Sequence, residues 1–271
     1  MSDLITIGDE ELLRIHRHFI NLTCLDEGPH ARKECGGQPK RYNFSAVAVE
    51  IDGVPLAITA GHVIADLERA IKAGAVITHW AIDDSIIMNH GHEPYPIGLD
   101  FDRDVTHVDA GGLDFAVFRF DPMARRALEG SAIIPADETI WDTDDLPEFP
   151  FWILVGTPVD LATLPASGVV EKNHVSIAVQ QLDARPEGLE ETVFPRLYGR
   201  LDFESVDGTA KFDIGGMSGG PIFAFRHPPQ GAVYDYRLLG IQSSWDGKNI
   251  AFFPLQQFLR ANGQLLLNGP A

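Results

Sequence analysis

Cysteine is scarce in this sequence. Cys24 and Cys35 are the only two cysteines among 271 residues. Two free thiols near the N-terminus are therefore expected, and a bridge that closes a short loop is the alternative. The chain also lacks an apolar run of roughly 18 residues, the length that a membrane-spanning helix needs. This absence excludes an integral membrane protein of the helical type.

Positive charge is also in short supply. The chain has 21 lysines and arginines against 39 aspartates and glutamates, which gives a net charge of −18. A field of this sign repels phosphate backbones and anionic lipids, so nucleic acid and membrane surfaces are excluded as main partners. The acidic residues gather at 100–114 and 137–148, which we interpret as solvated surface. Attraction of basic polypeptides is the weaker alternative.

The N-terminal residues, Met1–Ile5, have neither the basic region nor the long apolar run of a secretory signal. A cytoplasmic protein is therefore expected, and a signal removed from the chain is the alternative.

One glycine-rich stretch contains a candidate serine nucleophile. Gly216–Pro221 reads GMSGGP and precedes the apolar run Ile222–Phe225. A serine that attacks a carbonyl needs an exposed oxygen and backbone N–H groups nearby for the oxyanion, and glycines permit such a tight backbone. By itself the stretch fits a flexible turn equally well.

Two further motifs contain a histidine and an aspartate that could act together with this serine. Thr59–His62 (TAGH) follows a strand-like run, and Asp114–Val117 (DFAV) opens another one. Taken alone, such a histidine is usually structural and such an aspartate usually lies in a turn. A serine nucleophile, however, needs a base and a group that orients the base, and these motifs supply both in the order His, Asp, Ser.

Other nucleophilic arrangements fit less well. An α/β-hydrolase elbow needs an acid and a histidine after the serine, and His227 follows too closely. A subtilisin-like order would pair Asp52 with His62 and leave Asp114 unexplained. Neither cysteine has a comparable glycine frame.

The three motifs together resemble those of the trypsin/chymotrypsin-like serine peptidases, in the form found in bacterial intracellular proteins, over residues 40 to 262. The resemblance implies that Ser218 is the nucleophile, His62 the base and Asp114 its orienting group. It also implies an oxyanion hole formed by the backbone N–H groups of Gly216 and Ser218, and no metal or cofactor. Because secreted members carry several disulfides, the scarcity of cysteine favours a reducing compartment.

The chain departs from the family pattern at Met217, where secreted members have an aspartate that pairs with a new amino terminus. We therefore predict no activation of that kind. Alignment with the family places the primary specificity pocket near Phe212 and Asp213, with a wall formed by Ser243, Ser244 and Trp245. Asp213 favours a substrate arginine or lysine, whereas Phe212 would favour a small or apolar side chain.

Many short strands with Gly/Pro turns predict an all-β fold. With the resemblance, the expectation is two six-stranded antiparallel barrels with an added helix at each end. The predicted units are an N-terminal helical extension (1–40), a first barrel with His62 and Asp114 (41–125), a crossing segment and second barrel with Ser218 (126–253), and a C-terminal helix and tail (254–271). A helix is predicted over residues 9–21, and a connection over 26–41.

The sequence therefore predicts a serine endopeptidase acting on polypeptides. The alternative is a binding or regulatory protein of the same fold, with a latent triad that needs a protein partner, and an esterase is a further variant. Zinc held by His79, His90 and His92 is not expected, because no carboxylate or cysteine spacing supports it.

Overall fold

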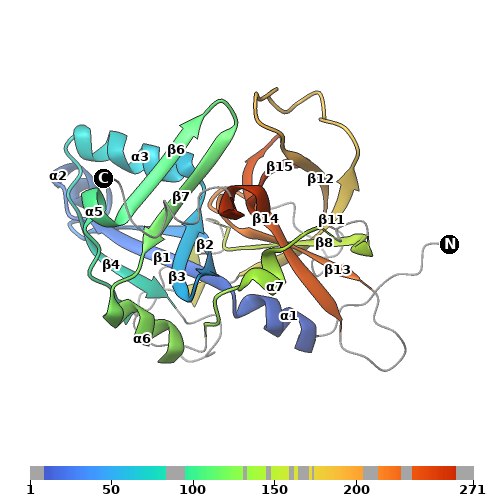
Figure 1. Cartoon of the computed structure of the whole chain (residues 1–271). Helices are drawn as coiled ribbons and strands as arrows, with labels where there is room; N and C mark the ends of the chain where they lie inside the picture. Colours follow the sequence, from blue (N-terminus) through green and yellow to red (C-terminus); the bar gives the residue numbers. More distant parts are fainter. Residues whose placement is uncertain are drawn as a thin grey trace.

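Two antiparallel β bodies lie side by side in the computed structural model of this chain (Figure 1). The structure describes residues 9–83, 95–130, 133–144, 148–158, 162–163, 171–172, 174–203, 213–226 and 234–260. Within these ranges, no helix has both the length and the apolar character needed to traverse a bilayer.

The first body is a sheet with the strand order β5-β4-β1-β2-β3-β7-β6. Its strands are β1 (Phe19–Asp26), β2 (Lys40–Ile51), β3 (Val54–Thr59), β4 (Ile77–Asp83), β5 (Tyr95–Pro96), β6 (Val105–Ala110) and β7 (Leu113–Arg119). Strands β2 and β3 form a hairpin in which Asp52 and Gly53 adopt φ angles of 49° and 75°.

Helices accompany the strands of the first body and the segment that leads to the second. They are α2 (Pro29–Glu34), α3 (Gly61–Lys72), α5 (Phe101–Asp104), α6 (Pro122–Gly130) and α7 (Glu138–Trp141). Helix α3 buries Ile64 and Leu67 against the sheet and carries Arg69 and Lys72 in its last turn, where cations interact favourably with the helix dipole.

The second body is a closed barrel with the order β11-β12-β15-β14-β13-β8. Its strands are β8 (Phe151–Gly156), β11 (Val175–Leu182), β12 (Leu197–Asp202), β13 (Pro221–Arg226), β14 (Asp235–Trp245) and β15 (Asn249–Pro254), beside a separate pair, β9 (Ala162–Thr163) and β10 (Glu171–Lys172). Residues 255–260 are helical. The predicted all-β fold with two antiparallel bodies and a helix at each end is confirmed, and the first body has a seventh strand because β5 pairs with β4.

The N-terminal region differs from the prediction. Helix α1 covers Asp9–His16, and the residues that follow form β1 rather than continuing the helix to residue 21. Strand β1 pairs with both β2 and β4, so the first sheet begins inside the segment predicted as an extension. The helix was predicted too long because Phe19 and Leu22 of β1 continue the helical spacing of Leu12 and Ile15. Residues 26–41, predicted as a connection, contain α2.

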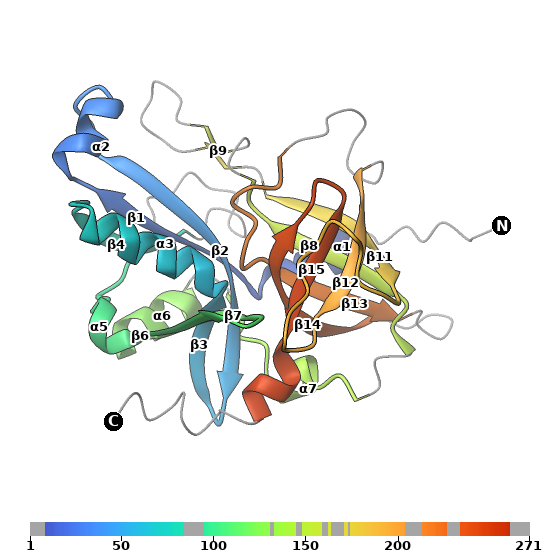
Figure 2. The ribbon, with the colours of Figure 1, turned by 90° about the horizontal axis from the view of Figure 1, so that it is seen from above.

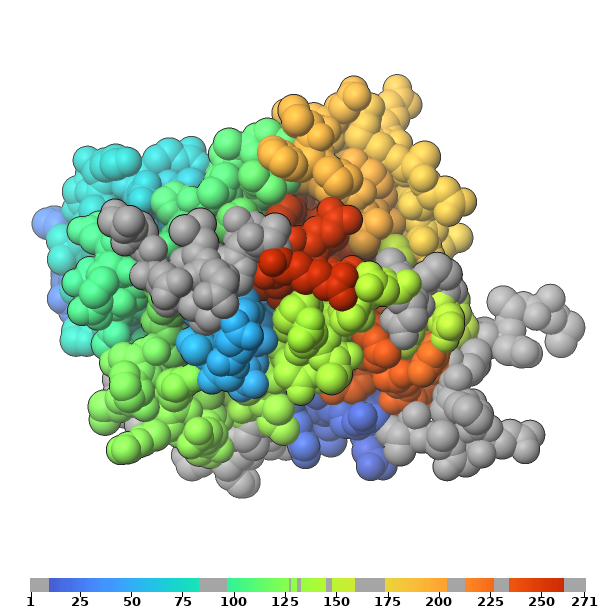
Figure 3. All heavy atoms as spheres, in the orientation of Figure 1, coloured from blue at the N-terminus to red at the C-terminus, as the bar shows by residue number. Residues whose placement is uncertain are grey.

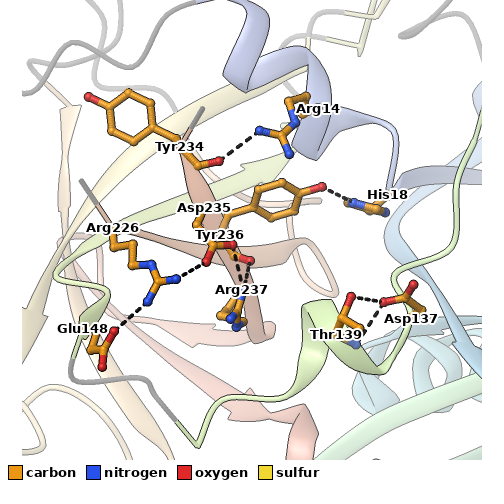
Figure 4. A network of polar contacts seen from close by, with 10 residues as sticks. All are labelled: Arg14, His18, Asp137, Thr139, Glu148, Arg226, Tyr234, Asp235, Tyr236 and Arg237. Atoms are coloured by element: carbon orange, nitrogen blue, oxygen red, sulfur yellow. Dashed lines mark hydrogen bonds and ion pairs between the residues drawn. The ribbon is translucent and has the colours of Figure 1, made fainter. Parts of the chain in front are cut away.

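The turn after α1 is held by an uncharged histidine (Figure 4). Burial is the main reason why the pKa of His18 falls to about 4, so the ring is neutral near pH 7. Its Nδ1 contacts the carbonyl oxygen of Ile134, which can only accept, so Nδ1 carries the proton and Nε2 accepts from the Tyr236 hydroxyl at 2.9 Å. Arg14 donates to the Tyr234 carbonyl and lies over the Tyr236 ring. The N-terminal segment is thereby joined to β14.

A continuous apolar core fills the space between the two bodies. It unites residues of β2, β3 and β7 with residues of β8, β13, β14 and β15, in addition to a separate core inside each body. The helical residues 255–260 complete this core. The centroid of the Phe258 ring lies 3.9 Å from the centroid of the Phe115 ring. Figure 2 shows this segment beside α7 at the junction, and Figure 3 shows it in red at the centre of one face. The two bodies are therefore packed as one unit.

Candidate active site

His62 lies in the first turn of α3, directly after β3. Its Nδ1 lies 2.9 Å from Oδ2 and 3.1 Å from Oδ1 of Asp114, the second residue of β7. Asp114 Oδ1 also accepts the backbone N–H of His62 at 2.9 Å. One carboxylate therefore caps the start of α3 and orients the imidazole that this helix carries.

Asp114 is almost fully buried, with 2% of its surface exposed. Burial alone would raise the pKa of this carboxyl group, but the hydrogen bonds and the charge of His62 hold it below its ordinary value. Ser243 on β14 lies beside the carboxylate and also lowers this pKa, although its hydroxyl does not reach normal hydrogen-bond geometry. Asp114 is therefore ionised near neutral pH.

Gly61 explains how closely α3 approaches the β6–β7 hairpin. A Cβ atom at this position would overlap the carbonyl oxygen of Val108 and lie 2.8 Å from the backbone N and O of Phe115. Only glycine fits without displacing the hairpin that carries Asp114. The distance between His62 and Asp114 therefore depends on the residue that precedes the histidine.

Ser218 lies in the loop before β13, where Gly216 and Gly219 have φ angles of 88° and 84°. The Gly219 N–H donates to Gln242 O, and the Gly220 N–H donates to Met217 O. Among the described residues, no protein acceptor pairs with the backbone N–H of Gly216 or of Ser218. These two donors are the ones that the sequence predicted for an oxyanion hole, and they are available to a ligand.

Ser218 and His62 line one cavity, together with Gly216. The structure thus brings the three motifs together across the junction between the two bodies. In the part of the chain that the structure describes, no hydrogen bond connects the Ser218 hydroxyl to the His62 ring. His62 and Asp114 are joined by hydrogen bonds, and Ser218 lines the same cavity as His62 without a hydrogen bond to its ring.

Comparisons with known proteins identify the fold. No family model matches the chain, and no curated protein sequence matches it. Among solved structures, the chain is similar to an inactivated protease paralogue from the scabies mite, with a TM-score of 0.53 and 12% identity over 94% of this chain and 96% of that one. A thermostable serine protease from an extremophilic microorganism matches with a TM-score of 0.44 and 11% identity, over 91% and 94% of the two chains. The chain has a trypsin-like, serine protease-type fold.

Met217 occupies the position where the resemblance implied an aspartate in secreted enzymes. Its side chain is fully buried in the core of the second barrel and lies so close to Gly156 that a Cβ there would be 2.8 Å from the methionine methyl group. The Met217 N–H donates to Ile214 O at 2.9 Å. Apolar packing of Met217 therefore anchors the loop that carries Ser218. No ion pair with an amino terminus was expected at this position.

The residues predicted for the specificity pocket are only partly described. Phe212 lies outside the described residues. Asp213 is exposed, and its Oδ1 accepts the Gly215 N–H at 2.6 Å within its own loop. Ser244 accepts a hydrogen bond from Arg196 at 3.2 Å, and Trp245 packs on the second-barrel core. The preference for arginine or lysine remains a prediction.

The remaining sequence predictions concern the two cysteines and the histidines considered for zinc. Cys24 is buried in β1 and Cys35 is exposed, and both are free thiols, as expected. Within the described ranges no group of His, Cys, Asp and Glu is arranged to hold a metal ion. His90 and His92 lie outside those ranges.

Sequence reasoning missed Ser45 on β2. Its hydroxyl donates to Gly216 O at 3.1 Å and accepts the Thr157 N–H at 3.2 Å, while its carbonyl accepts from Thr59 Oγ1 at 2.7 Å. Ser45 is 1% exposed. It therefore connects the first sheet to the loop of Ser218 and to the end of β8. No sequence signal marks it, because Ser45 and Gly216 are 171 positions apart.

We expect Ser45→Ala to lower the free energy of unfolding by about 1–3 kcal/mol, because the Thr157 N–H is then buried without a partner. It should also lower kcat, because the Gly216 peptide loses one of its anchors. Chemical denaturation and steady-state kinetics measure the two effects. Ser176→Ala is the matched control, since it removes one hydrogen bond to His16 away from this loop. Equal kcat values for the two variants would contradict a role of Ser45 in holding the loop.

Proposed function

We propose that this chain is a serine endopeptidase that hydrolyses polypeptides through an acyl-enzyme intermediate. The observation that carries the proposal is the 2.9 Å hydrogen bond between His62 Nδ1 and the buried Asp114 carboxylate, with His62 and Ser218 in the wall of one cavity. A base with a fixed tautomer beside an accessible hydroxyl is the minimum that nucleophilic catalysis by serine requires.

Each residue has a defined role in this reaction. Because Asp114 accepts the Nδ1 proton, His62 Nε2 is unprotonated and takes the proton of the Ser218 hydroxyl as its oxygen attacks the scissile carbonyl. His62 then gives this proton to the leaving amine, whose C–N bond breaks. Water attacks the Ser218 ester in the second half of the cycle, with His62 again acting as the base. A rotation of the Ser218 side chain toward the ring precedes the first step.

The N–H groups of Gly216 and Ser218 would stabilise the oxyanion. Removing one such donor in a serine protease costs on the order of 3 kcal/mol in the barrier. Here the loop is held by Ser45 and by the buried Met217 side chain, so the site needs no amine generated by processing. The proposal includes no metal and no cofactor.

A second candidate is a binding or regulatory protein that keeps the triad but does not turn over. The Ser218 hydroxyl has no hydrogen bond to His62 in the described residues, which favours this candidate. The scabies mite relative is described as an inactivated protease paralogue. In this chain, unlike in a protein that has lost its triad, all three side chains are present.

Reaction with a fluorophosphonate probe tests the proposal. We expect covalent labelling of the folded wild type at Ser218, found by mass spectrometry of the labelled peptide, and no labelling of Ser218→Ala. Ser176→Ala controls for loss of any serine and should label like the wild type. A folded wild type that resists labelling would contradict the peptidase and support the binding protein.

A further inference from the structure

Histidines hold the N-terminal segment, residues 9–18, on the second barrel. His16, the last residue of α1, places its Nε2 2.9 Å from the hydroxyl oxygen of Ser176 on β11. The Nδ1 of His16 lies 3.1 Å from Nε2 of His174, the residue before β11, and the two rings meet edge to face. His16 is buried and His174 is half-buried. Groups of the second barrel therefore contact both nitrogens of the His16 ring.

The pair of His16 and His174 accommodates one added proton but not two. In the neutral pair, one ring nitrogen donates to the other across the 3.1 Å contact. A doubly protonated pair would place two N–H groups opposite each other at this distance. Burial lowers the pKa of both histidines, and the charge of His174 lowers the pKa of His16 further, so both rings are neutral near pH 7. Acid therefore converts a hydrogen bond into a repulsive contact.

His18 provides a second contact of the same kind. Its Nε2 accepts a hydrogen bond from the Tyr236 hydroxyl of β14 (Figure 4). The charge of Asp137 favours protonation of this ring, and the charges of Arg14 and Arg17 oppose it. Burial has the largest effect, and the pKa of His18 falls to about 4. The charged form is thus disfavoured at this contact as well.

The remaining contacts of the segment do not depend on a histidine. Arg14 donates to the Tyr234 carbonyl, and Ile15 is fully buried in the core between the two bodies. Directly after the segment, β1 pairs with β2 and β4 in the first sheet. The segment can therefore leave the second barrel without removing β1 from its sheet.

We propose that the contact between the N-terminal segment and the second barrel is an acid-sensitive latch. Protonation of His16, His18 and His174 releases residues 9–18, while β1 and the two bodies stay folded. Because burial lowers each pKa, the stability that the neutral histidines contribute is fully present above about pH 6.5. It is lost as the pH falls toward the lowered pKa values, which for His18 means toward about pH 4. This inference does not depend on the proposed peptidase function.

Hydrogen exchange at pH 7 and pH 5 tests the latch, with each rate divided by the intrinsic rate at that pH. The Ile134 N–H donates to the Arg17 carbonyl, so this amide reports on the contact. The lowered pKa of His18 alone predicts a roughly twentyfold loss of protection between the two pH values, and the pair of His16 and His174 adds to it. Amides within β2 and β14 should keep their protection. Unchanged protection of Ile134, or its loss together with that of both bodies, would overturn the inference.

Substitutions that cannot titrate provide the second measurement. His18→Asn keeps an N–H group for the Ile134 carbonyl and should make the loss of protection roughly twentyfold smaller than in the wild type. His16→Gln keeps a neutral group beside Ser176 and should also reduce the loss, which guards against a folding defect in either variant. His30→Gln is the matched control, because His30 is exposed on α2, and it should behave like the wild type. The same loss in all four proteins would overturn the assignment of the latch to these histidines.

Discussion

Asp114→Asn is expected to lower kcat about ten-thousandfold, the size of the effect of the same change in a Ser-His-Asp protease. Asp114 accepts from His62 Nδ1 through both carboxylate oxygens. An asparagine can present its NH₂ group to Nδ1 instead, which moves the ring proton to Nε2. His62 then cannot take the proton of Ser218, because the nitrogen that faces the cavity is already protonated.

Folding should survive this substitution, since asparagine has the same shape and its oxygen still accepts the His62 backbone N–H. Steady-state kinetics with a peptide substrate and a denaturation curve separate the two effects. Asp109→Asn is the matched control, because Asp109 lies opposite Asp114 in the same hairpin, is exposed and loses the same charge. If both variants kept wild-type kcat, Asp114 would have no part in catalysis.

Gly219→Ala is expected to lower the free energy of unfolding by about 3–5 kcal/mol, the sum of backbone strain and steric overlap. Its φ of 84° disfavours any residue with a Cβ. The added atom would also overlap Thr59 Oγ1 and the Ser45 carbonyl, and would lie 2.8 Å from Ala60 N. Relief of this overlap requires the Ser218 loop to move away from the first sheet, so peptide cleavage should also be lost.

Gly247→Ala separates the two causes. Gly247 has a similar φ of 94°, but an added Cβ meets no atom within 4 Å. We therefore expect a loss of about 1–2 kcal/mol from backbone strain alone. Urea denaturation of both variants measures the difference, and equal losses would show that the contact between the loop and the first sheet does not constrain position 219.

The sequence was sufficient where local pattern and tertiary structure agree. The all-β fold was predicted from many short strands separated by Gly/Pro turns, and in strands such as Val175–Leu182 buried residues alternate in part with more exposed ones. The pairing of His62 with Asp114 was predicted from the order of three motifs, and the structure shows the hydrogen bond. Each of these motifs and strands is a short run of neighbouring residues, so local sequence was enough to find it.

The rest depends on contacts between distant segments. Strand β1 was missed because Phe19 and Leu22 continue the helical spacing of the residues before them, and its pairing with β2 and β4 depends on distant segments. The role of Ser45 depends on a loop 171 positions away. The cavity that His62 and Ser218 line is bounded by residues of α3 and by Tyr42–Phe44 of β2, and no local motif predicts that these segments meet.

The position of residues 255–260 has a consequence for biosynthesis. Leu255, Phe258 and Leu259 fill the apolar core between the two bodies, yet they follow every strand of both bodies in the chain. During translation the first sheet, with His62 and Asp114, leaves the ribosome before the barrel that carries Ser218. The core between them is completed last, so the two bodies cannot reach their final packing until synthesis has passed this helix.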